Sequence, residues 1–263
     1  MQKDRWFSGH PAAPGAQQLW CFPYAGGSGT VFHAWKQAFS DDVELRALEL
    51  PGRWTRSAEP LRRRFFPLVE EVADAMERNL STEYSLFGYS LGGLLAFEVA
   101  RTLARRGKPY PRRLFVAACA APQVDRKRDV LHDLPDHAFL DGLSRRYAPL
   151  PEVILEDEEM LNVVLRILRA DLELLHDYHF TAGDALDCPI VAFGGRADKS
   201  VSAEGLAGWR ACSTHAFSSH WFDGDHFFIT SHGKSLARSV YQYLSEPRQA
   251  AVIPPDPARM SNP

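Results

Sequence analysis

The sequence predicts an α/β fold in which a mostly parallel central sheet is covered by helices on both faces. Short strand-like apolar runs alternate with longer segments of helical periodicity, and no repeat or low-complexity segment interrupts them. In the clearest unit, Ser85–Arg106, an apolar run leads through a tight glycine-containing turn directly into a helical pattern. The expected strands are Gln18–Pro23, Leu45–Leu50, Ser85–Tyr89, Arg113–Cys119, Pro189–Gly194 and His215–Phe222.

Two helices between these strands are indicated by spacing and by end signals. Phe65–Leu80 carries apolar residues in steps of three and four, so one of its faces is expected to pack on the sheet. Leu91–Arg106 has small residues on one side, which lets its backbone approach a strand. It ends in arginines followed by Gly107 and Pro109, which suit a helix C-terminus.

The segment Gln123–Thr181 breaks the alternation, because it is long and holds no strand candidate. Leucines recur at helical spacing from Leu161 to Leu175, and Met160, Val163 and Ile167 add a second apolar stripe. A helix of this kind needs cover on two sides. We interpret the insertion, about 123–181, as a helical lid that rests on the core and lines a channel for an apolar substrate. The alternative is a core helix that contacts no ligand.

Length and composition limit the organisation of the chain. Its 263 residues suit one α/β domain over 1–246, and the proline-rich tail 247–263 lacks periodicity and is expected to be disordered. The net charge of −3 gives no basic field for nucleic acid. The polar N-terminus and the short longest apolar run, Leu114–Ala121, predict no secretory leader and no membrane span. We therefore expect a cytoplasmic monomer.

The four cysteines do not suggest a metal or redox site. They are scattered singly, without C-x-x-C spacing, and most lie in or beside strand-like runs. We expect reduced, structural thiols and neither a metal nor a cofactor.

Gly88-Tyr89-Ser90-Leu91-Gly92 matches the G-x-S-x-G pattern of a nucleophile elbow. Three fixed positions match by chance in roughly one chain in ten of this length, so the context decides. Here a strand-like run precedes the serine and a helical pattern follows it, as the motif requires. Ser90 is therefore the candidate nucleophile. The alternative is a serine that only caps the helix.

A serine hydroxyl needs a base, which in hydrolases of this kind is a histidine that follows the last strand. His226 lies just beyond the strand ending at Phe222 and before the last helical pattern. The other nine histidines lie in predicted strands or helices, in the insertion, or near the N-terminus. We predict His226 as the general base, with a surface histidine as the alternative.

The acid that orients the imidazole should follow a strand between the serine and the histidine. Asp198 does so directly after Pro189–Gly194. The alternative is an aspartate that only caps the next helix. Three other aspartates are less well placed, either before that strand or too close to the histidine: Asp187, Asp223 and Asp225. The chain order serine, aspartate, histidine is that of the α/β-hydrolase fold, and it differs from the chymotrypsin and subtilisin orders.

A tetrahedral intermediate needs backbone donors. Leu91, directly after the nucleophile, is expected to supply one N–H. The glycine-rich loop after the first predicted core strand, FPYAGGSG, is expected to supply the other, from Ala25 or alternatively from Tyr24. This loop lacks the spacing of a nucleotide-binding loop.

The motifs FPYAGGSG, GYSLGG, GGRADKSV and GDHFF occur in this order, and with them the sequence resembles the type II, or discrete, thioesterases that accompany polyketide synthases and nonribosomal peptide synthetases. The resemblance covers Leu19–Leu244. It implies hydrolysis of acyl thioesters on the phosphopantetheine arm of acyl or peptidyl carrier proteins, which removes stalled or wrong acyl groups in antibiotic biosynthesis. One departure is Tyr89, where many members carry histidine, and we expect this position to tune the pocket.

The implied carrier proteins are usually acidic, so basic residues near the mouth of the site would help docking. Arg126, Lys127 and Arg128 follow the strand ending at Cys119 and are expected at the same edge of the sheet as Ser90. A solvated charged surface is the alternative.

Three other functions use the same residues or the same fold. A carboxylesterase or lipase would share the whole catalytic set. A non-catalytic binding protein of this fold would not need all three triad members in order. A macrocyclase that releases product is less favoured, because no carrier domain adjoins the site in this chain.

Overall fold

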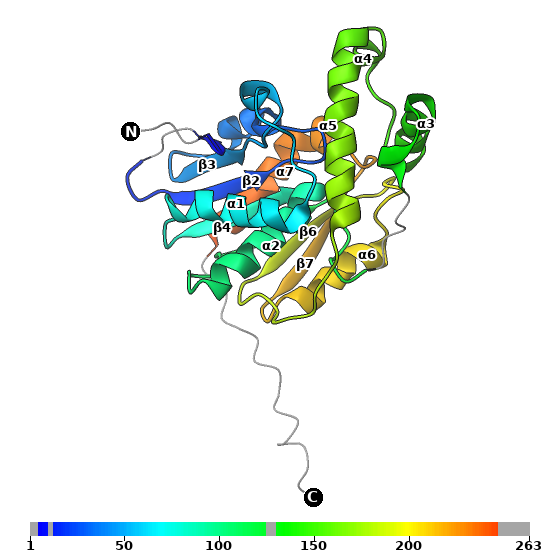
Figure 1. Ribbon diagram of the computed structural model, residues 1–263. Helices are drawn as coiled ribbons and strands as arrows, with labels where there is room; N and C mark the ends of the chain where they lie inside the picture. The colour runs from blue at the N-terminus through cyan, green and yellow to red at the C-terminus, as the bar shows by residue number, and fades with distance from the viewer. Residues whose placement is uncertain (1–4, 10–12, 125–129, 247–263) are drawn as a thin grey trace, which may run out of the picture.

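The computed structural model describes residues 5–9, 13–124 and 130–246. In these residues a seven-stranded sheet has the order β1-β3-β2-β4-β5-β6-β7, and every neighbouring pair is parallel except β1 and β3 (Figure 1). The strands are β1 Phe7–Gly9, β2 Gln17–Phe22, β3 Val43–Leu48, β4 Tyr84–Tyr89, β5 Leu114–Ala117, β6 Ile190–Gly195 and β7 Phe217–Phe222.

The predicted α/β-hydrolase fold and all of its expected strands are confirmed, with ends that shift by a few residues. The structure also has one strand, β1, that was not predicted from the sequence. It has three residues and pairs antiparallel with β3 at the edge of the sheet, with Phe7 opposite Leu48. The Phe7 ring also packs on Trp20 at 4.5 Å between centroids. Tertiary contacts therefore create this strand.

Helices cover both faces of the sheet, because alternate strand residues point to opposite sides. On β2, Trp20 packs in the core with α1 (Phe65–Glu77) and α2 (Leu91–Arg105), whereas Leu19 packs in the core with the 3-10 segment η1 (Gly29–Ala38) and with α7 (Phe228–Ser245). The segments outside the insertion are η1 Gly29–Ala38, η2 Trp54–Arg56, α1 Phe65–Glu77, α2 Leu91–Arg105, α6 Ala203–Ala207, η4 Gly208–Cys212 and α7 Phe228–Ser245.

The insertion between β5 and β6 has its own small core. Its segments are η3 Leu131–Asp133, α3 Asp136–Arg146, α4 Glu152–Leu155 and α5 Glu158–Asp177. Phe139 and Leu143 of α3 pack against Leu165, Leu168 and Leu172 of α5. The α4 end of α5 stands clear of the sheet in Figure 1. The leucine-rich helix is thus confirmed, but Met160 and Val163 of its second apolar stripe are exposed.

All four cysteines are buried thiols. Within the described ranges, no helix combines the length and the apolar character needed to cross a membrane. The predicted tail, 247–263, lies outside the described residues.

Candidate active site

Ser90 occupies the sharp turn between β4 and α2. Its backbone has φ 53° and ψ −116°, a conformation that is strained for a residue with a side chain. The turn needs its glycines. A Cβ on Gly88 would lie 2.2 Å from the Gly92 carbonyl oxygen, and a Cβ on Gly92 would lie 2.1 Å from the Phe22 carbonyl oxygen. The glycines thus let strand, turn and helix approach closely enough to present the serine.

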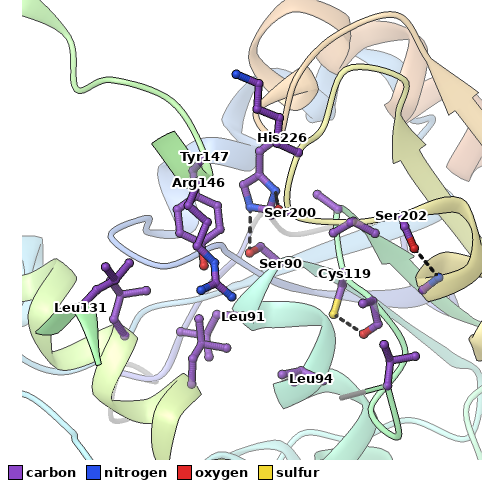
Figure 2. A pocket seen from close by; sticks show the side chains of 18 of the residues that line it. Ser90, Leu91, Leu94, Cys119, Leu131, Arg146, Tyr147, Ser200, Ser202 and His226 are labelled. Carbon is purple, nitrogen blue, oxygen red and sulfur yellow. Dashed lines mark hydrogen bonds between the residues drawn. The ribbon is translucent and has the colours of Figure 1, made fainter. Parts of the chain in front are cut away.

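The structure brings Ser90, His226 and Asp198 together, as predicted. His226 Nε2 lies 3.0 Å from Ser90 Oγ, and His226 Nδ1 lies 2.9 Å from Asp198 Oδ2 (Figure 2 shows the serine–histidine pair). The Asp198 side chain has no exposed surface, and 4% of the His226 side chain is exposed. The three residues stand after β4, after β6 and after β7, at the carboxyl ends of parallel strands.

Ser200 is a fourth polar member of the site, and the sequence analysis missed it. Its hydroxyl lies 2.7 Å from Asp198 Oδ1 and 2.9 Å from His226 Nδ1, and its N–H donates to Asp198 Oδ1 across 2.8 Å. The signal was present, because a serine two residues after an aspartate can close a local side-chain turn. Burial opposes ionisation of Asp198. The hydrogen bonds and charge of His226 and the Ser200 bonds outweigh it, so the pKa of Asp198 lies below its ordinary value.

Tyr89 contacts the backbone of the catalytic histidine. Its hydroxyl donates to the His226 backbone carbonyl across 2.7 Å and accepts from the Ile229 N–H across 3.3 Å. The Tyr89 side chain is fully buried and lines neither cavity described below, so the effect on the pocket predicted from the sequence would act through the residues that Tyr89 contacts. Burial raises the pKa of Tyr89 well above its ordinary value, so the hydroxyl stays protonated and can donate.

The other aspartates weighed from the sequence have other partners. Asp187 lies 2.7 Å from His215 Nε2, before the start of β6. Asp223 pairs with Arg196, and Asp225 accepts the Phe227 N–H across 2.8 Å.

The glycine-rich loop after β2 forms a tight turn beside Ser90. The Gly27 N–H donates to the Tyr24 carbonyl across 2.9 Å, and Gly26 has φ +81°, as the third position of a type II turn requires. Among the described residues the Ala25 N–H has no protein acceptor. Leu91 is the first residue of α2, so its N–H has no intrahelical acceptor. Both N–H groups predicted from the sequence are therefore available to a ligand.

Two cavities meet at Ser90. The first, about 560 Å³, is lined by residues of α2, α3 and the loop after β6. The second, about 880 Å³, lies under the insertion and is walled mainly by apolar residues of α5 and of the loop between α3 and α4. The residues common to both walls are Ser90, Tyr147, Leu172, Leu175 and His226. Tyr147 stands between them, with its ring 4.8 Å from the His226 ring.

Basic residues line the first cavity. Arg145 and Arg146 come from the end of α3, and Lys199 comes from the loop that carries Asp198. Figure 2 shows Arg146 beside Tyr147, facing Ser90. The predicted docking residues Arg126, Lys127 and Arg128 lie outside the described residues. In the part of the chain that the structure describes, no group of three or more histidine, cysteine, aspartate or glutamate side chains is arranged to hold a metal ion.

Comparisons with known proteins identify the family of the chain. Residues 17–243 match the family model "Thioesterase domain". The chain is 35% identical over 229 residues to the gramicidin S biosynthesis protein GrsT of Aneurinibacillus migulanus, covering 87% of this chain and 89% of that protein.

Two solved structures are also similar. One is the RedJ thioesterase from the prodiginine pathway of Streptomyces coelicolor, with 36% identity, TM-score 0.81, and coverage of 89% of this chain and 88% of RedJ. The other is the type II thioesterase BorB from the borrelidin biosynthetic cluster, with 27% identity, TM-score 0.82, and coverage of 95% of this chain and 100% of BorB. The chain belongs to the thioesterase family and is a serine hydrolase that acts on thioesters.

Proposed function

We propose that this protein is a type II thioesterase that hydrolyses acyl thioesters on the phosphopantetheine arm of acyl or peptidyl carrier proteins, and so removes stalled or wrong acyl groups. The observation that carries the proposal is the meeting of an apolar and a basic cavity at Ser90. A thioester carbon at Ser90 would have its acyl chain in the apolar cavity and its charged arm in the basic one. Similarity to the type II thioesterase BorB supports the same function.

The proposed mechanism uses the residues gathered at the serine. Ser90 Oγ attacks the thioester carbonyl carbon as His226 Nε2 takes its proton, and Asp198 stabilises the imidazolium. The Ala25 and Leu91 N–H groups stabilise the oxyanion. His226 then protonates the leaving thiolate, and the acyl group stays on Ser90. In the second half-reaction water, with His226 as base, attacks this acyl ester, and the acid is released as Ser90 regains its proton. No cofactor of the enzyme is needed, because the phosphopantetheine belongs to the substrate.

The basic residues of the first cavity support recognition of the carrier-borne arm. Arg145 and Lys199 are exposed, and their charges complement both the phosphate of the arm and an acidic carrier surface. The outer end of the insertion has the opposite character, because acidic residues gather there: Glu152, Glu156, Asp157, Glu158 and Glu159. An acidic carrier is therefore expected to approach from the basic side.

Mass spectrometry of acyl-loaded carrier proteins tests the function directly. We expect the wild-type protein to remove the acyl group, and Ser90→Ala to leave it in place. A matched comparison uses an acyl N-acetylcysteamine thioester, which lacks the phosphate and the carrier. The double variant Arg145→Gln, Arg146→Gln is expected to lower kcat/KM about tenfold on the carrier substrate and little on the truncated one.

An esterase is the rival function, since an oxygen ester would use the same residues. Turnover of a thioester and an oxygen ester with the same acyl chain separates the two. A strong preference for the oxygen ester contradicts the proposal, and so does hydrolysis that persists unchanged in Ser90→Ala.

A further inference from the structure

A buried ion pair joins the insertion to the turn that carries Ala25. Asp171, on α5, accepts from Arg53 Nη1 and Nη2, both across 2.6 Å. The same carboxylate accepts the Gly26 N–H across 2.7 Å. The side chains of Asp171 and Arg53 are 0% and 1% exposed. A buried charged pair is costly to desolvate, and it is tolerated when hydrogen bonds satisfy its atoms, as they do here for both carboxylate oxygens.

The hydrogen bond to Gly26 fixes the central peptide of the turn. In the turn Tyr24–Gly27 this is the Ala25–Gly26 peptide, whose N–H points to Asp171. A flip of this peptide to the other common turn type would direct its carbonyl, and not its N–H, toward a carboxylate. The negative charge of Asp171 opposes that flip, so the turn is held in one form.

Packing adds a second contact between α5 and the turn. A Cβ on Gly26 would lie 2.7 Å from Leu168 Cδ2, so the turn is seated directly on the helix. Leu168 precedes Asp171 by one helical turn, and both Leu168 and Leu172 line the apolar cavity. The part of α5 that faces the apolar cavity therefore also holds the turn.

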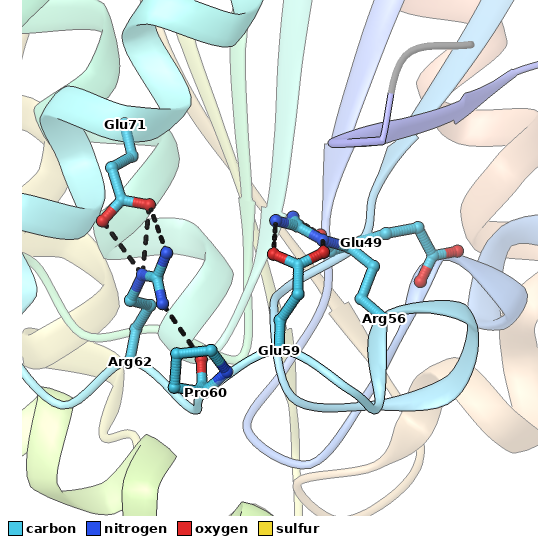
Figure 3. Close-up of polar contacts among 6 residues, drawn as sticks. All are labelled: Glu49, Arg56, Glu59, Pro60, Arg62 and Glu71. Carbon is cyan, nitrogen blue, oxygen red and sulfur yellow. Dashed lines mark hydrogen bonds and ion pairs between the residues drawn. The ribbon is translucent and has the colours of Figure 1, made fainter.

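The segment that follows Arg53 is anchored by the side chains of Arg56 and Arg62 (Figure 3). Arg56 donates to the Glu49 carbonyl across 2.8 Å and forms two hydrogen bonds with Glu59. Further along, Arg62 binds Glu71 of α1 through both its Nε and its Nη2. Hydrogen bonds therefore hold the loop that carries Arg53, and Arg53 in turn binds the Asp171 carboxylate.

We propose that Asp171 is a positioning residue for the oxyanion hole: with Arg53 it fixes the place of the Tyr24–Gly27 turn, and with the turn the Ala25 N–H, which belongs to the neighbouring Tyr24–Ala25 peptide. The inference rests on the proposed function, because it assumes that Ser90 is acylated. If the inference holds, the position of the Ala25 N–H depends on the position of α5. The helix that lines the apolar cavity would then also place this oxyanion donor.

The test combines kinetics with binding of a transition-state mimic. Asp171→Asn is expected to lower kcat about tenfold to hundredfold with KM little changed, since loss of one oxyanion donor acts on the transition state. A trifluoromethyl ketone that adds reversibly to Ser90 carries the same oxyanion, so its affinity should fall in parallel with kcat. Glu173→Gln is the matched control, because Glu173 lies on the same helix and pairs with Arg63 near the surface. It should keep both values within twofold.

A second variant separates positioning from stability. The double substitution Asp171→Leu, Arg53→Met removes both buried charges and should fold well, but it leaves the Gly26 N–H without its acceptor. We expect its midpoint of thermal unfolding to equal or exceed that of the wild type. We expect its kcat to remain at least tenfold below the wild-type value. Full activity in this folded double variant overturns the inference, as does an unchanged ketone affinity in Asp171→Asn. If either of these results is obtained and Ser90→Ala is inactive, the inference about Asp171 fails but the proposed function is retained.

Discussion

The hydroxyl of Tyr89 donates a hydrogen bond across 2.7 Å to the backbone carbonyl of His226, and so ties the strand that leads to Ser90 to the loop that carries the histidine. Tyr89 to Phe keeps the ring but leaves this buried carbonyl without its donor. We expect the free energy of unfolding to fall by about 1 kcal/mol and kcat to fall several-fold, with KM nearly constant. Chemical denaturation and steady-state kinetics measure both.

The matched control for this substitution is Tyr243→Phe. Tyr243 also uses its hydroxyl, with Ser218 and His220 of β7, but none of these residues lines the cavities at Ser90. Its loss should affect stability without lowering kcat. Equal loss of kcat in both variants would show that the effect of Tyr89 is not specific to the histidine loop.

Ser200→Ala removes a hydroxyl that contacts both Asp198 and His226. The Ser200 N–H still donates to Asp198, so the carboxylate keeps one of its two bonds from this residue. We expect kcat to fall about tenfold, the equivalent of one buried hydrogen bond, with the fold intact. Rates within twofold of wild type would mean that the hydroxyl does not help to orient the pair.

Gly92→Ala tests the steric requirement of the turn at Ser90. The new Cβ would meet the Phe22 carbonyl oxygen at 2.1 Å and the Pro23 carbonyl oxygen at 2.6 Å, and these are backbone atoms that cannot move easily. We expect a loss of several kcal/mol or failure to fold. Gly107→Ala is the comparison: it has φ +74° and no atom within 4 Å of its Cβ, so it should lose only about 1 kcal/mol. Thermal unfolding of both variants measures the difference.

Acyl-chain length should depend on the apolar cavity. Ile167→Phe adds volume to the wall of that cavity, so kcat/KM for long acyl thioesters should fall at least tenfold more than for acetyl or propionyl thioesters. Val153→Phe, at an exposed position outside the cavity wall, should leave the ratio unchanged. A uniform loss across all chain lengths would argue that the acyl group binds elsewhere.

The lowered pKa of Asp198 predicts a particular pH dependence of stability. A carboxylate with a lowered folded-state pKa stabilises the protein fully above its ordinary pKa of about 4, and this contribution is lost as pH falls through the folded-state value. The difference in unfolding free energy between wild type and Asp198→Asn should therefore be smaller at pH 3 than at pH 5. Urea denaturation across this range measures it, and a difference that widens in acid contradicts the prediction.

The sequence by itself determined six of the strands and the main helices in chain order, though not β1, and the candidates at Ser90, Asp198 and His226. Local rules suffice for these features: strand-like runs form strands, glycine permits the turn at Ser90, and parallel strands bring their carboxyl ends to one edge. Once the strand order is known, the serine, the acid and the histidine must lie at that edge.

Tertiary structure alone decided the contacts between segments that are far apart in the chain. Asp171 and Arg53 are separated by 118 residues, and Tyr89 and the His226 carbonyl by 137. A charged residue in a leucine-rich helix and a tyrosine beside the nucleophile carry no local signal of these partners. Which buried polar groups meet depends on the exact seating of packed elements. Sequence periodicity gives the face of a helix that is buried, but not the atoms that it will touch.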